Sequence, residues 1–457
     1  MLKINPEIFK AYDIRGIYGQ DFDDNLAYFL GPAFIKLRQT DPDFIPGKKL
    51  KIAVASDMRL SSPSLKESLM KGLLSAGAEV VDLGLVSTPT FYFAVANYQY
   101  DGGIMISASH NPKEWNGFKL VRAKSLPISG ETGISFLKEE ILNNNLLEKD
   151  VSGEIIINEK ALDDELKYTW SLIDQKKIKK IKIIADAANS MGALYLEKIF
   201  AKLPGESIAL NFNLDGNFPA HEADPLKEEN LEELKKAVIS KGADLGIASD
   251  GDGDRIFFVD DRGEIINPAI IRGLLSQSFL KDKPGAKIGY DVRPGKITPD
   301  MITASGGEAI LTRVGHSLIK EQMIKEDIYF AGESSGHFYF NSPIGCFEFP
   351  SLMILKLLLI FSSSNKKISE QIKPFQKYYL SGEINRQVED KEAVLNALEK
   401  KYQDGKINKL DGLSVTYNDF WFNVRASNTE AKIRLNLEAI TPEIMVKKRD
   451  EILELIK

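Results

Sequence analysis

The sequence has only one cysteine, Cys346, among its 457 residues. A single thiol cannot form an internal disulfide or a cysteine-rich zinc site, which indicates a reducing compartment. Long apolar runs are also missing: the longest, residues 353–361, contains Lys356 and is too short to span a bilayer. The N-terminal segment has no apolar stretch of signal-peptide length. We therefore expect a cytoplasmic protein with no membrane partner.

The chain also has no excess of positive charge. Its 59 Lys and Arg residues are outnumbered by 65 Asp and Glu residues, which gives a net charge of −6. This balance argues against nucleic acid or an anionic membrane as a main partner, because both attract basic surfaces. Hydrophobic residues at 43% and charged residues at 27% exclude wholesale disorder. The oligomeric state stays open between a monomer and a homodimer.

A unit of strand, helix and second strand recurs three times. Each first strand is a short, largely β-branched apolar run that follows a lysine and ends at an aspartate, and each second strand runs into a polar loop. The aspartates are Asp57, Asp186 and Asp291, and the loops begin near Ser109, Asp250 and Glu333. Alternating strands and helices indicate βαβ crossovers, in which ligands collect at the carboxyl ends of the strands. We therefore expect the polar loops to form the ligand-binding side of the protein.

The pattern changes after about residue 364, where a lysine-containing linker leads to strands expected within residues 411–419 and 420–425. We therefore predict an α/β protein with three related α/β domains, each with a mixed sheet, and a smaller C-terminal α+β domain. The predicted domain boundaries are 1–152, 153–258, 259–368 and 369–457. In the second unit, Asp224 and Pro225 predict the start of a helix, and Gly242 predicts its end.

Asp250, Asp252 and Asp254 alternate with glycines in the loop of the second unit. Three carboxylates this close repel one another unless a cation lies among them, and the glycines let the backbone curl so that they converge. Oxygen ligands favour Mg²⁺ before Ca²⁺ or Mn²⁺. An EF-hand does not fit, because Arg255 stands where that loop needs glycine and Asp261 where it needs a bidentate glutamate. A plain surface turn is the remaining alternative.

Ser109 follows an apolar run in the loop of the first unit, where its hydroxyl could meet a phosphoryl group. A serine in such a turn is by itself more often structural. Lys119 could balance the charge of a transferring phosphoryl group or shuttle a proton, or it could be a solvated surface lysine. Arg15 could contact phosphate in a bidentate manner, or it could form a structural ion pair with Asp13.

Two further loops have the composition of a sugar site and a phosphate site. Glu333 could accept hydrogen bonds from neighbouring sugar hydroxyls, with serines and His337 beside it. Residues 425–429, Arg-Ala-Ser-Asn-Thr, offer many donors for a dianionic phosphate. Either segment could instead be an ordinary polar loop.

Eight motifs resemble the alpha-D-phosphohexomutase family, and within it the phosphomannomutase/phosphoglucomutase branch. In chain order they are AYDIRG, ISASHNP, NGFK, DGNFP, SDGDGDR, GHSLIK, GESSGH and RASNTE. The resemblance spans essentially the whole chain and implies four domains around one central cleft. It also implies that hexose 6-phosphate and hexose 1-phosphate are interconverted through a phosphoserine enzyme and a 1,6-bisphosphate intermediate.

The resemblance implies a role for each matching residue. It implies one Mg²⁺ per active site, held by Asp250, Asp252, Asp254 and phosphorylated Ser109, with hexose 1,6-bisphosphate as activator and a phosphosugar as substrate. The implied catalytic residues are Ser109, Lys119, Arg15, Arg255 and His316. The implied substrate-binding residues are Tyr12, Arg293, His316, Glu333, Ser334, Ser335, Gly336, His337, Arg425, Ala426, Ser427, Asn428 and Thr429.

The chain departs from this branch in two places. Residues 346–350 stand where paired acidic residues and a glycine are frequent, and Arg293 stands where lysine is frequent. Three other functions remain open: a phosphoglucosamine mutase, a metal-dependent Ser-phosphate phosphatase, and a sugar-phosphate-binding protein without catalysis. The GHSLIK and NGFK motifs favour the hexose branch.

Overall fold

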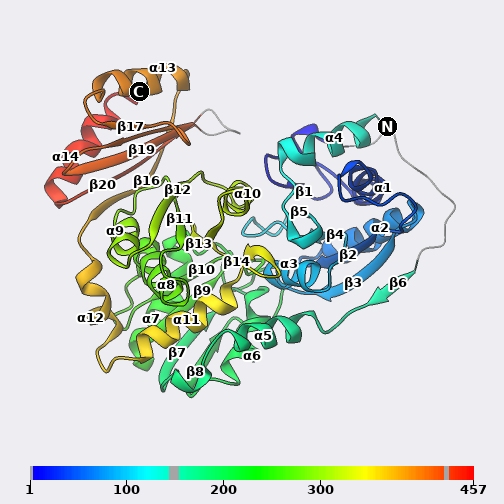
Figure 1. The fold of residues 1–457 in the computed structure, drawn as a ribbon, viewed down its shortest axis with the longest axis horizontal. Coiled ribbons are helices and arrows are strands. Elements are labelled where there is room, and N and C mark those ends of the chain that lie inside the picture. The colour runs from blue at the N-terminus through cyan, green and yellow to red at the C-terminus, as the bar shows by residue number, and fades with distance from the viewer. Residues whose placement is uncertain (1–3, 144–153, 427–431, 457) are drawn as a thin grey trace.

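The computed structural model describes residues 4–143, 154–426 and 432–456. Four separate sheets follow one another along the chain. Figure 1 shows the blue first sheet and the orange-to-red fourth sheet on opposite sides of the view, with the green second and third sheets between them. Among the described residues, no helix is both long enough and apolar enough to cross a membrane.

The first sheet has the strand order β1-β5-β4-β2-β3-β6 and mixes parallel and antiparallel pairs. Its central strand β4 is buried along its whole length, which explains its unbroken apolar sequence. Its strands are β1 (Ile14–Ile17), β2 (Lys51–Ser56), β3 (Glu79–Leu85), β4 (Gly102–Ile106), β5 (Trp115–Arg122) and β6 (Ile155–Ile157). The helices of this part are α1 (Asp24–Thr40), α2 (Ser62–Ser75), α3 (Thr88–Asn97) and α4 (Ser135–Leu142).

The second and third sheets are also mixed, with strand orders β10-β9-β7-β8 and β12-β11-β13-β14-β15. The second contains β7 (Ile181–Asp186), β8 (Gly205–Leu210), β9 (Leu245–Ser249) and β10 (Ile256–Val259), with α5 (Ala161–Ser171), α6 (Gly192–Phe200) and α7 (Glu232–Lys241). The third contains β11 (Lys287–Asp291), β12 (Glu308–Thr312), β13 (Ile328–Gly332), β14 (Phe338–Ser342) and β15 (Gly345–Glu348). Its helices are α8 (Pro268–Asp282), α9 (Ile297–Ala304), α10 (His316–Glu326), α11 (Pro350–Ser362) and α12 (Ile368–Ile372).

The fourth sheet is entirely antiparallel, with the order β16-β20-β19-β18-β17 and a hydrophobic core of its own. Its strands are β16 (Tyr379–Gln387), β17 (Lys406–Asn408), β18 (Leu413–Thr416), β19 (Phe420–Ala426) and β20 (Lys432–Ala439), covered by α13 (Lys391–Lys401) and α14 (Pro442–Leu453). Three mixed sheets followed by a small antiparallel one confirm the predicted fold class. The domain boundaries at residues 152, 258 and 368 stay predictions.

The recurring unit has a structural counterpart in all three mixed sheets. The two strands of each unit are parallel neighbours: β2 pairs with β4, β7 with β9, and β11 with β13. Parallel neighbours end at the same side of a sheet, so the loop that follows each first strand lies beside the loop that follows each second strand. This pairing places the Ser109, Asp250 and Glu333 loops at carboxyl ends of strands.

The helix predicted from residue 225 is correct at its end and wrong at its start. Helix α7 ends at Gly242, whose φ of 59° provides the left-handed cap. It begins only at Glu232, after a 3₁₀ turn over Glu228–Leu231. Asp224 does not cap a helix, because its carboxylate accepts the Leu226 N–H inside a loop. Ala223 of this loop lies against the acidic loop described below, because its Cβ is 3.6 Å from the position a Cβ would take on Gly251.

A buried carboxyl group joins three helices of different sheets. Glu165 of α5 accepts hydrogen bonds from Thr90 Oγ1 of α3 at 2.5 Å and from Ser351 Oγ of α11 at 2.8 Å. Within the described residues Glu165 forms no ion pair with a lysine, arginine or histidine. Burial raises the pKa of Glu165 from 4.5 to about 7, although both hydroxyls act in the opposite direction.

This group predicts a pH-dependent stability. Between pH 4.5 and 7 the folded protein keeps a proton on Glu165 that the unfolded chain has lost, so the free energy of unfolding falls as the pH rises. Glu165→Gln removes this titration. As the pH rises from 4.5 to 7, the free energy of unfolding of the variant should therefore increase relative to that of the wild type by up to about 3 kcal/mol. Thermal or urea unfolding from pH 4.5 to 8 measures the difference.

Glu451→Gln is the matched control, because the pKa of Glu451 is lowered to about 2: burial acts to raise it, and hydrogen bonds from Lys448, Lys401 and Tyr402 outweigh that. Its effect on stability should therefore be constant between pH 5 and 8. A Glu165→Gln difference that does not change with pH contradicts the prediction.

Candidate active site

The nucleophile candidate Ser109 lies in a strained loop directly after β4. Its φ is 51°, in the left-handed region that non-glycine residues adopt only when the surroundings hold them there. The backbone N–H of Ser109 donates to Ser107 Oγ at 3.0 Å. Its hydroxyl donates to Asp250 Oδ2 at 3.0 Å, across 141 positions of sequence. The loop therefore holds the hydroxyl of Ser109 against the acidic loop of the second sheet.

Asp250, Asp252 and Asp254 follow β9 in a turn in which Gly253 has a φ of 75°. Their side chains are buried, and one ligand atom of each lies within 4.8 Å of the others. Burial and the charges of Asp254 and Asp252 raise the pKa of Asp250 well above its usual range. Among the described residues, the buried Asp252 Oδ1 has no hydrogen-bond partner. These oxygens form a group that could hold a metal ion, and the donor set suits Mg²⁺.

Lys119 of β5 is buried against these carboxylates. Its Nζ donates to Asp252 Oδ2 at 2.6 Å and to Asp254 Oδ2 at 2.7 Å. Asp252 Oδ2 also accepts from Thr88 Oγ1 at the start of α3, at 2.6 Å. Lys119 is thus no surface lysine: it lies between the nucleophile sheet and the acidic loop and reduces the repulsion among the carboxylates.

His337 connects the acidic loop to the sugar-loop candidate. Its Nε2 lies 3.1 Å from Asp254 Oδ1, and its Nδ1 lies 3.1 Å from Glu333 Oε2. Burial alone would lower the pKa of His337, but the Asp254 and Glu333 carboxylates raise it to about 9. Arg255 also lies beside the acidic loop, with its Nε 3.6 Å from Asp250 Oδ2. A protonated imidazole and a guanidinium therefore add positive charge to the site.

Glu333 is held as an ionised carboxylate at the end of β13. It accepts from Tyr339 Oη at 2.6 Å and from the Gly315 N–H at 3.0 Å, and Arg293 lies 3.4 Å away. Burial would raise the pKa of Glu333, but His337 and Arg293 hold it well below the usual range. The lysine-to-arginine departure at position 293 therefore still places a cation beside the sugar-loop carboxylate.

The first and third sheets contribute aromatic and imidazole rings to the same cleft. Tyr12 and His316 pack edge to face, with ring centroids 5.9 Å apart. Burial, Lys320 and Lys119 lower the pKa of His316 well below its usual value, so the ring is neutral at pH 7. Arg15 donates to Asn111 Oδ1 at 2.7 Å and also pairs with Asp13, so its phosphate-binding and ion-pairing interpretations are not exclusive.

Two arginines of the fourth sheet lie directly opposite each other. Arg425 of β19 pairs with Arg434 of β20 in the strand register. Like charges at paired positions are unfavourable unless an anion lies between them. Glu383 is 3.8 Å from Arg425 and 3.6 Å from Arg434, and within the described residues the buried Nε atoms of both arginines have no partner. This pair suits the binding of a dianionic phosphate.

These residues surround one cleft with a volume of about 700 Å³. Its walls include residues from the first, third and fourth sheets and from the acidic loop of the second. Of the predicted site residues, those lining it are Tyr12, Arg15, Ser109, Lys119, Arg255, Arg293, His316, Glu333, Ser335, His337, Arg425 and Ala426. Asp250, Asp252 and Asp254 are buried behind Ser109, and Ser334 instead donates to Asp291 at 3.0 Å. Gly336 forms a turn with a φ of 86°, and Ser427, Asn428 and Thr429 lie outside the described residues.

Four charged residues that line the cleft were not predicted from the sequence: Lys10, Arg313, Asp411 and Arg434. The alternating polar and apolar residues of 432–439 were a signal for the strand that carries Arg434, but that strand was not predicted. The other departure, at residues 346–350, places the buried Glu348 3.0 Å from the buried Lys320. An internal ion pair therefore occupies that segment.

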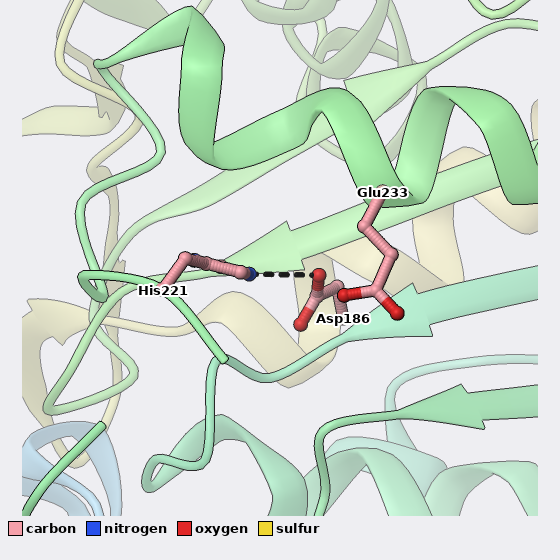
Figure 2. A group of neighbouring side chains, drawn as sticks. All are labelled: Asp186, His221 and Glu233. Atoms are coloured by element: carbon pink, nitrogen blue, oxygen red, sulfur yellow. Dashed lines mark hydrogen bonds and ion pairs between the residues drawn. The ribbon is translucent and has the colours of Figure 1, made fainter. Parts of the chain in front are cut away.

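A second group of neighbouring ligand-type side chains lies at the end of β7 (Figure 2). His221 Nε2 is 3.0 Å from Asp186 Oδ2, and Asn211 donates to both Asp186 and Glu233 at 3.1 Å. Burial would lower the pKa of His221, but Asp186 and the Glu222 carbonyl raise it. The group is satisfied by these contacts and ties the 211–224 loop to β7.

The acidic triplet predicts a metal-binding site. Asp252→Asn removes one charge and should weaken Mg²⁺ or Mn²⁺ binding at least about tenfold, because a hard cation depends on carboxylate charge. Isothermal titration calorimetry with Mn²⁺ measures this directly. Asp186→Asn is the matched control and should leave the affinity unchanged. Wild-type affinity in Asp252→Asn would exclude the triplet as the site.

Comparison with known proteins gives the same picture over the whole chain. Phosphoglucomutase/phosphomannomutase alpha/beta/alpha domains I, II and III match residues 6–145, 164–263 and 267–378, and the C-terminal domain of that family matches residues 383–455.

Individual relatives cover nearly the full length. A phosphomannomutase of Methanocaldococcus jannaschii is 39% identical over 462 residues, covering 98% of this chain and 97% of the relative. A phosphomannomutase of Escherichia coli K12 is 36% identical over 442 residues and 94% of both chains. A crystal structure of a phosphoglucomutase/phosphomannomutase family protein from Burkholderia thailandensis has a TM-score of 0.87 at 31% identity, covering 99% of this chain and 98% of that one. The protein therefore belongs to the phosphoglucomutase/phosphomannomutase family, as its motifs predicted.

Proposed function

We propose that this phosphohexose mutase interconverts hexose 6-phosphate and hexose 1-phosphate, with mannose and glucose as the candidate sugars, through a phosphoserine at Ser109. The observation that carries the proposal is the 3.0 Å contact between Ser109 Oγ and Asp250 Oδ2, in a cleft that also contains the Arg425–Arg434 pair. A nucleophile and a phosphate clamp in one cleft suit a substrate with a phosphate at either end.

In the proposed first step, phosphorylated Ser109 gives its phosphoryl group to the free hydroxyl of the bound sugar phosphate. The bond between Oγ and phosphorus breaks as the sugar hydroxyl oxygen bonds to phosphorus and gives up its proton to a base in the cleft, which yields a 1,6-bisphosphate. After the intermediate turns over in the cleft, Ser109 Oγ takes the other phosphoryl group and the product leaves. Free hexose 1,6-bisphosphate would act as activator by phosphorylating Ser109.

Charge neutralisation supplies most of the catalysis in this proposal. Lys119, Arg15 and Arg255 would stabilise the negative charge on the transferring group. One Mg²⁺, held by the three aspartates and a phosphoserine oxygen, would withdraw further charge from that group. Neutral His316 is suited to accept the proton of the attacking hydroxyl at Nε2, because its Nδ1 faces Glu348 at 4.0 Å.

Recognition of the sugar must tolerate two orientations. Glu333, ionised and fixed by Tyr339, would accept hydrogen bonds from two neighbouring hydroxyls. Ser335 and His337 would add adaptable partners, and Tyr12 and Arg293 would line the sugar from the sides. The Arg425–Arg434 pair, together with residues 427–429, would bind the phosphate that is not reacting.

A coupled assay of mannose 1-phosphate and glucose 1-phosphate, with and without Mg²⁺ and bisphosphate, tests the function. Isomerisation of either sugar that requires both additions is the expected result. Sustained release of inorganic phosphate would favour the phosphatase, and a preference for glucosamine 6-phosphate would favour the phosphoglucosamine mutase. The phosphomannomutase relatives favour neither alternative.

Ser109→Ala should reduce turnover at least about a thousandfold, because no other group can replace the covalent acceptor. Intact-protein mass spectrometry should find the phosphoryl adduct of the wild type absent in the variant. Ser171→Ala, at an exposed position of α5, is the control and should keep both properties. Normal activity in Ser109→Ala would contradict the proposed role of Ser109 as the covalent phosphoryl acceptor.

Arg434→Lys keeps the charge but loses the two-pronged contact with phosphate. We expect KM for the hexose phosphate to rise about tenfold with kcat within about threefold, because the clamp binds ground state and transition state alike. Arg386→Lys, an exposed arginine of β16, is the matched control. Steady-state kinetics measure both constants. An unchanged KM in Arg434→Lys would show that Arg434 does not bind the substrate phosphate.

A further inference from the structure

Arg59 is a fully buried arginine whose donors all point at the nucleophile loop or its support. Its Nη1 donates to the carbonyls of Pro112 and Trp115 at 2.7 and 3.0 Å. Its Nη2 donates to the carbonyls of Ser109 and Asn111 at 2.8 and 2.6 Å. Four carbonyls of one irregular loop therefore converge on a single guanidinium.

The remaining N–H of this guanidinium is also used. Arg59 Nε donates to Asp57 Oδ2 at 3.2 Å, and the Asp57 carboxylate also accepts from the Arg59 backbone N–H and from Ser62 Oγ. Asp57 follows β2, the parallel neighbour of β4, so Arg59 reaches sideways from one strand end to the next. All five donors have a partner, and only arginine offers five donors in a planar fork.

The loop needs this support because of its geometry. Ser109 holds a left-handed φ of 51°, and buried carbonyls without a donor cost stability. The Ser109 carbonyl also faces Gly251 of the acidic loop, where an added Cβ would lie 2.2 Å from it. The backbone that Arg59 holds is therefore the backbone that fits against the acidic loop.

A turn of the second sheet region covers Arg59 from outside. The ring centroid of Phe218 lies 5.1 Å from Arg59 Cζ, and Phe218 has a strained φ of 51°. At Gly216 an added Cβ would lie 2.7 Å from the Met58 carbonyl and 3.0 Å from Arg59 Cα, so the turn lies directly on this backbone. An aromatic face over a desolvated guanidinium is attractive.

The turn that carries Phe218 is anchored to β7. His221, three residues later, binds Asp186 at the end of that strand (Figure 2). Before the turn, the Asp215 N–H donates to the Asn189 carbonyl at 3.0 Å, and Asn189 Nδ2 donates to the Asn213 carbonyl at 2.9 Å. Phe218 is therefore fixed to the same sheet that ends in the acidic loop.

We propose that Arg59 is a positioning residue for phosphoryl transfer and that Phe218 clamps it. Arg59 fixes the 109–115 backbone and so holds Ser109 Oγ against the acidic triplet, and Phe218 ties this support to the second sheet. The inference rests on the proposed function of Ser109. It adds two residues that do not touch the reacting atoms and that set the geometry of the nucleophile.

The test separates this geometry from substrate binding. Phosphoryl transfer from hexose 1,6-bisphosphate to Ser109 of the full-length protein is followed by rapid quench and intact-protein mass spectrometry. Arg59→Lys should slow this step at least about tenfold while KM for the hexose phosphate stays within about twofold, because only the nucleophile is displaced. A wild-type transfer rate in Arg59→Lys overturns the proposal.

Arg38→Lys is the matched control. Arg38 is also a buried arginine near the first sheet, but it bonds to Asp41, Asp43 and the Asp101 carbonyl, away from the loop. Thermal unfolding shows how much each variant is destabilised. If Arg38→Lys slows transfer as much as Arg59→Lys, the effect is general destabilisation and the proposal fails.

Phe218→Leu keeps the test open if Arg59→Lys does not fold, because Phe218 is only half-buried. It should slow transfer about threefold with KM unchanged. Adding it to Arg59→Lys should slow transfer no further, because coupled residues are not additive. If the two substitutions slow transfer independently, or if Phe218→Leu has no effect, the proposed role of Phe218 is wrong. If wild-type Ser109 accepts no phosphoryl group, the proposed function fails instead, which is a separate result.

Discussion

The structure depends on the close approach of three buried carboxylates to one serine hydroxyl. Asp250, Asp252 and Asp254 would repel one another and the hydroxyl oxygen if they were left alone in a buried turn. Lys119, Arg255 and His337 supply compensating charge from three different loops and strands. No single domain contains this balance, so the site exists only when the first, second and third sheets are together. An enzyme that moves a highly charged phosphoryl group needs such a balance before substrate arrives.

Parallel strand pairing delivers these groups to one place. In each mixed sheet the two strands of the recurring unit end side by side, so a charged residue after the first strand can support the loop after the second. Asp57 with Arg59 does this for the Ser109 loop, and Asp291 with Arg272 and Arg293 does it for the Glu333 loop. The same arrangement of a supporting charged pair therefore recurs in the first and third sheets, although the residues it supports, Ser109 and Glu333, differ in their chemistry.

The fourth sheet supplies the end of the cleft that the other three lack. Within the described residues, the carboxylate oxygens paired with Arg425 and Arg434 lie 3.6 to 3.8 Å away, whereas Lys119 and Arg15 near Ser109 are hydrogen-bonded to aspartates. The two ends of the cleft differ in this respect, which fits the proposed transfer of a phosphoryl group at one end and the proposed binding of the non-reacting phosphate at the other.

The sequence by itself determined the fold class, the recurring unit and the loops that carry Ser109, the aspartates and Glu333, because these follow from local patterns of apolar runs and polar turns. It also determined the end of helix α7 at Gly242, a local backbone property. It did not determine the start of that helix, where Asp224 serves a loop, or the partners of Lys119, or the support of Ser109 by Arg59. The partners of Lys119 lie 133 and 135 positions away, and Arg59 lies 50 positions from Ser109. Only tertiary packing decides which charge meets which, because the energy of a buried charge depends on partners that the local sequence does not contain.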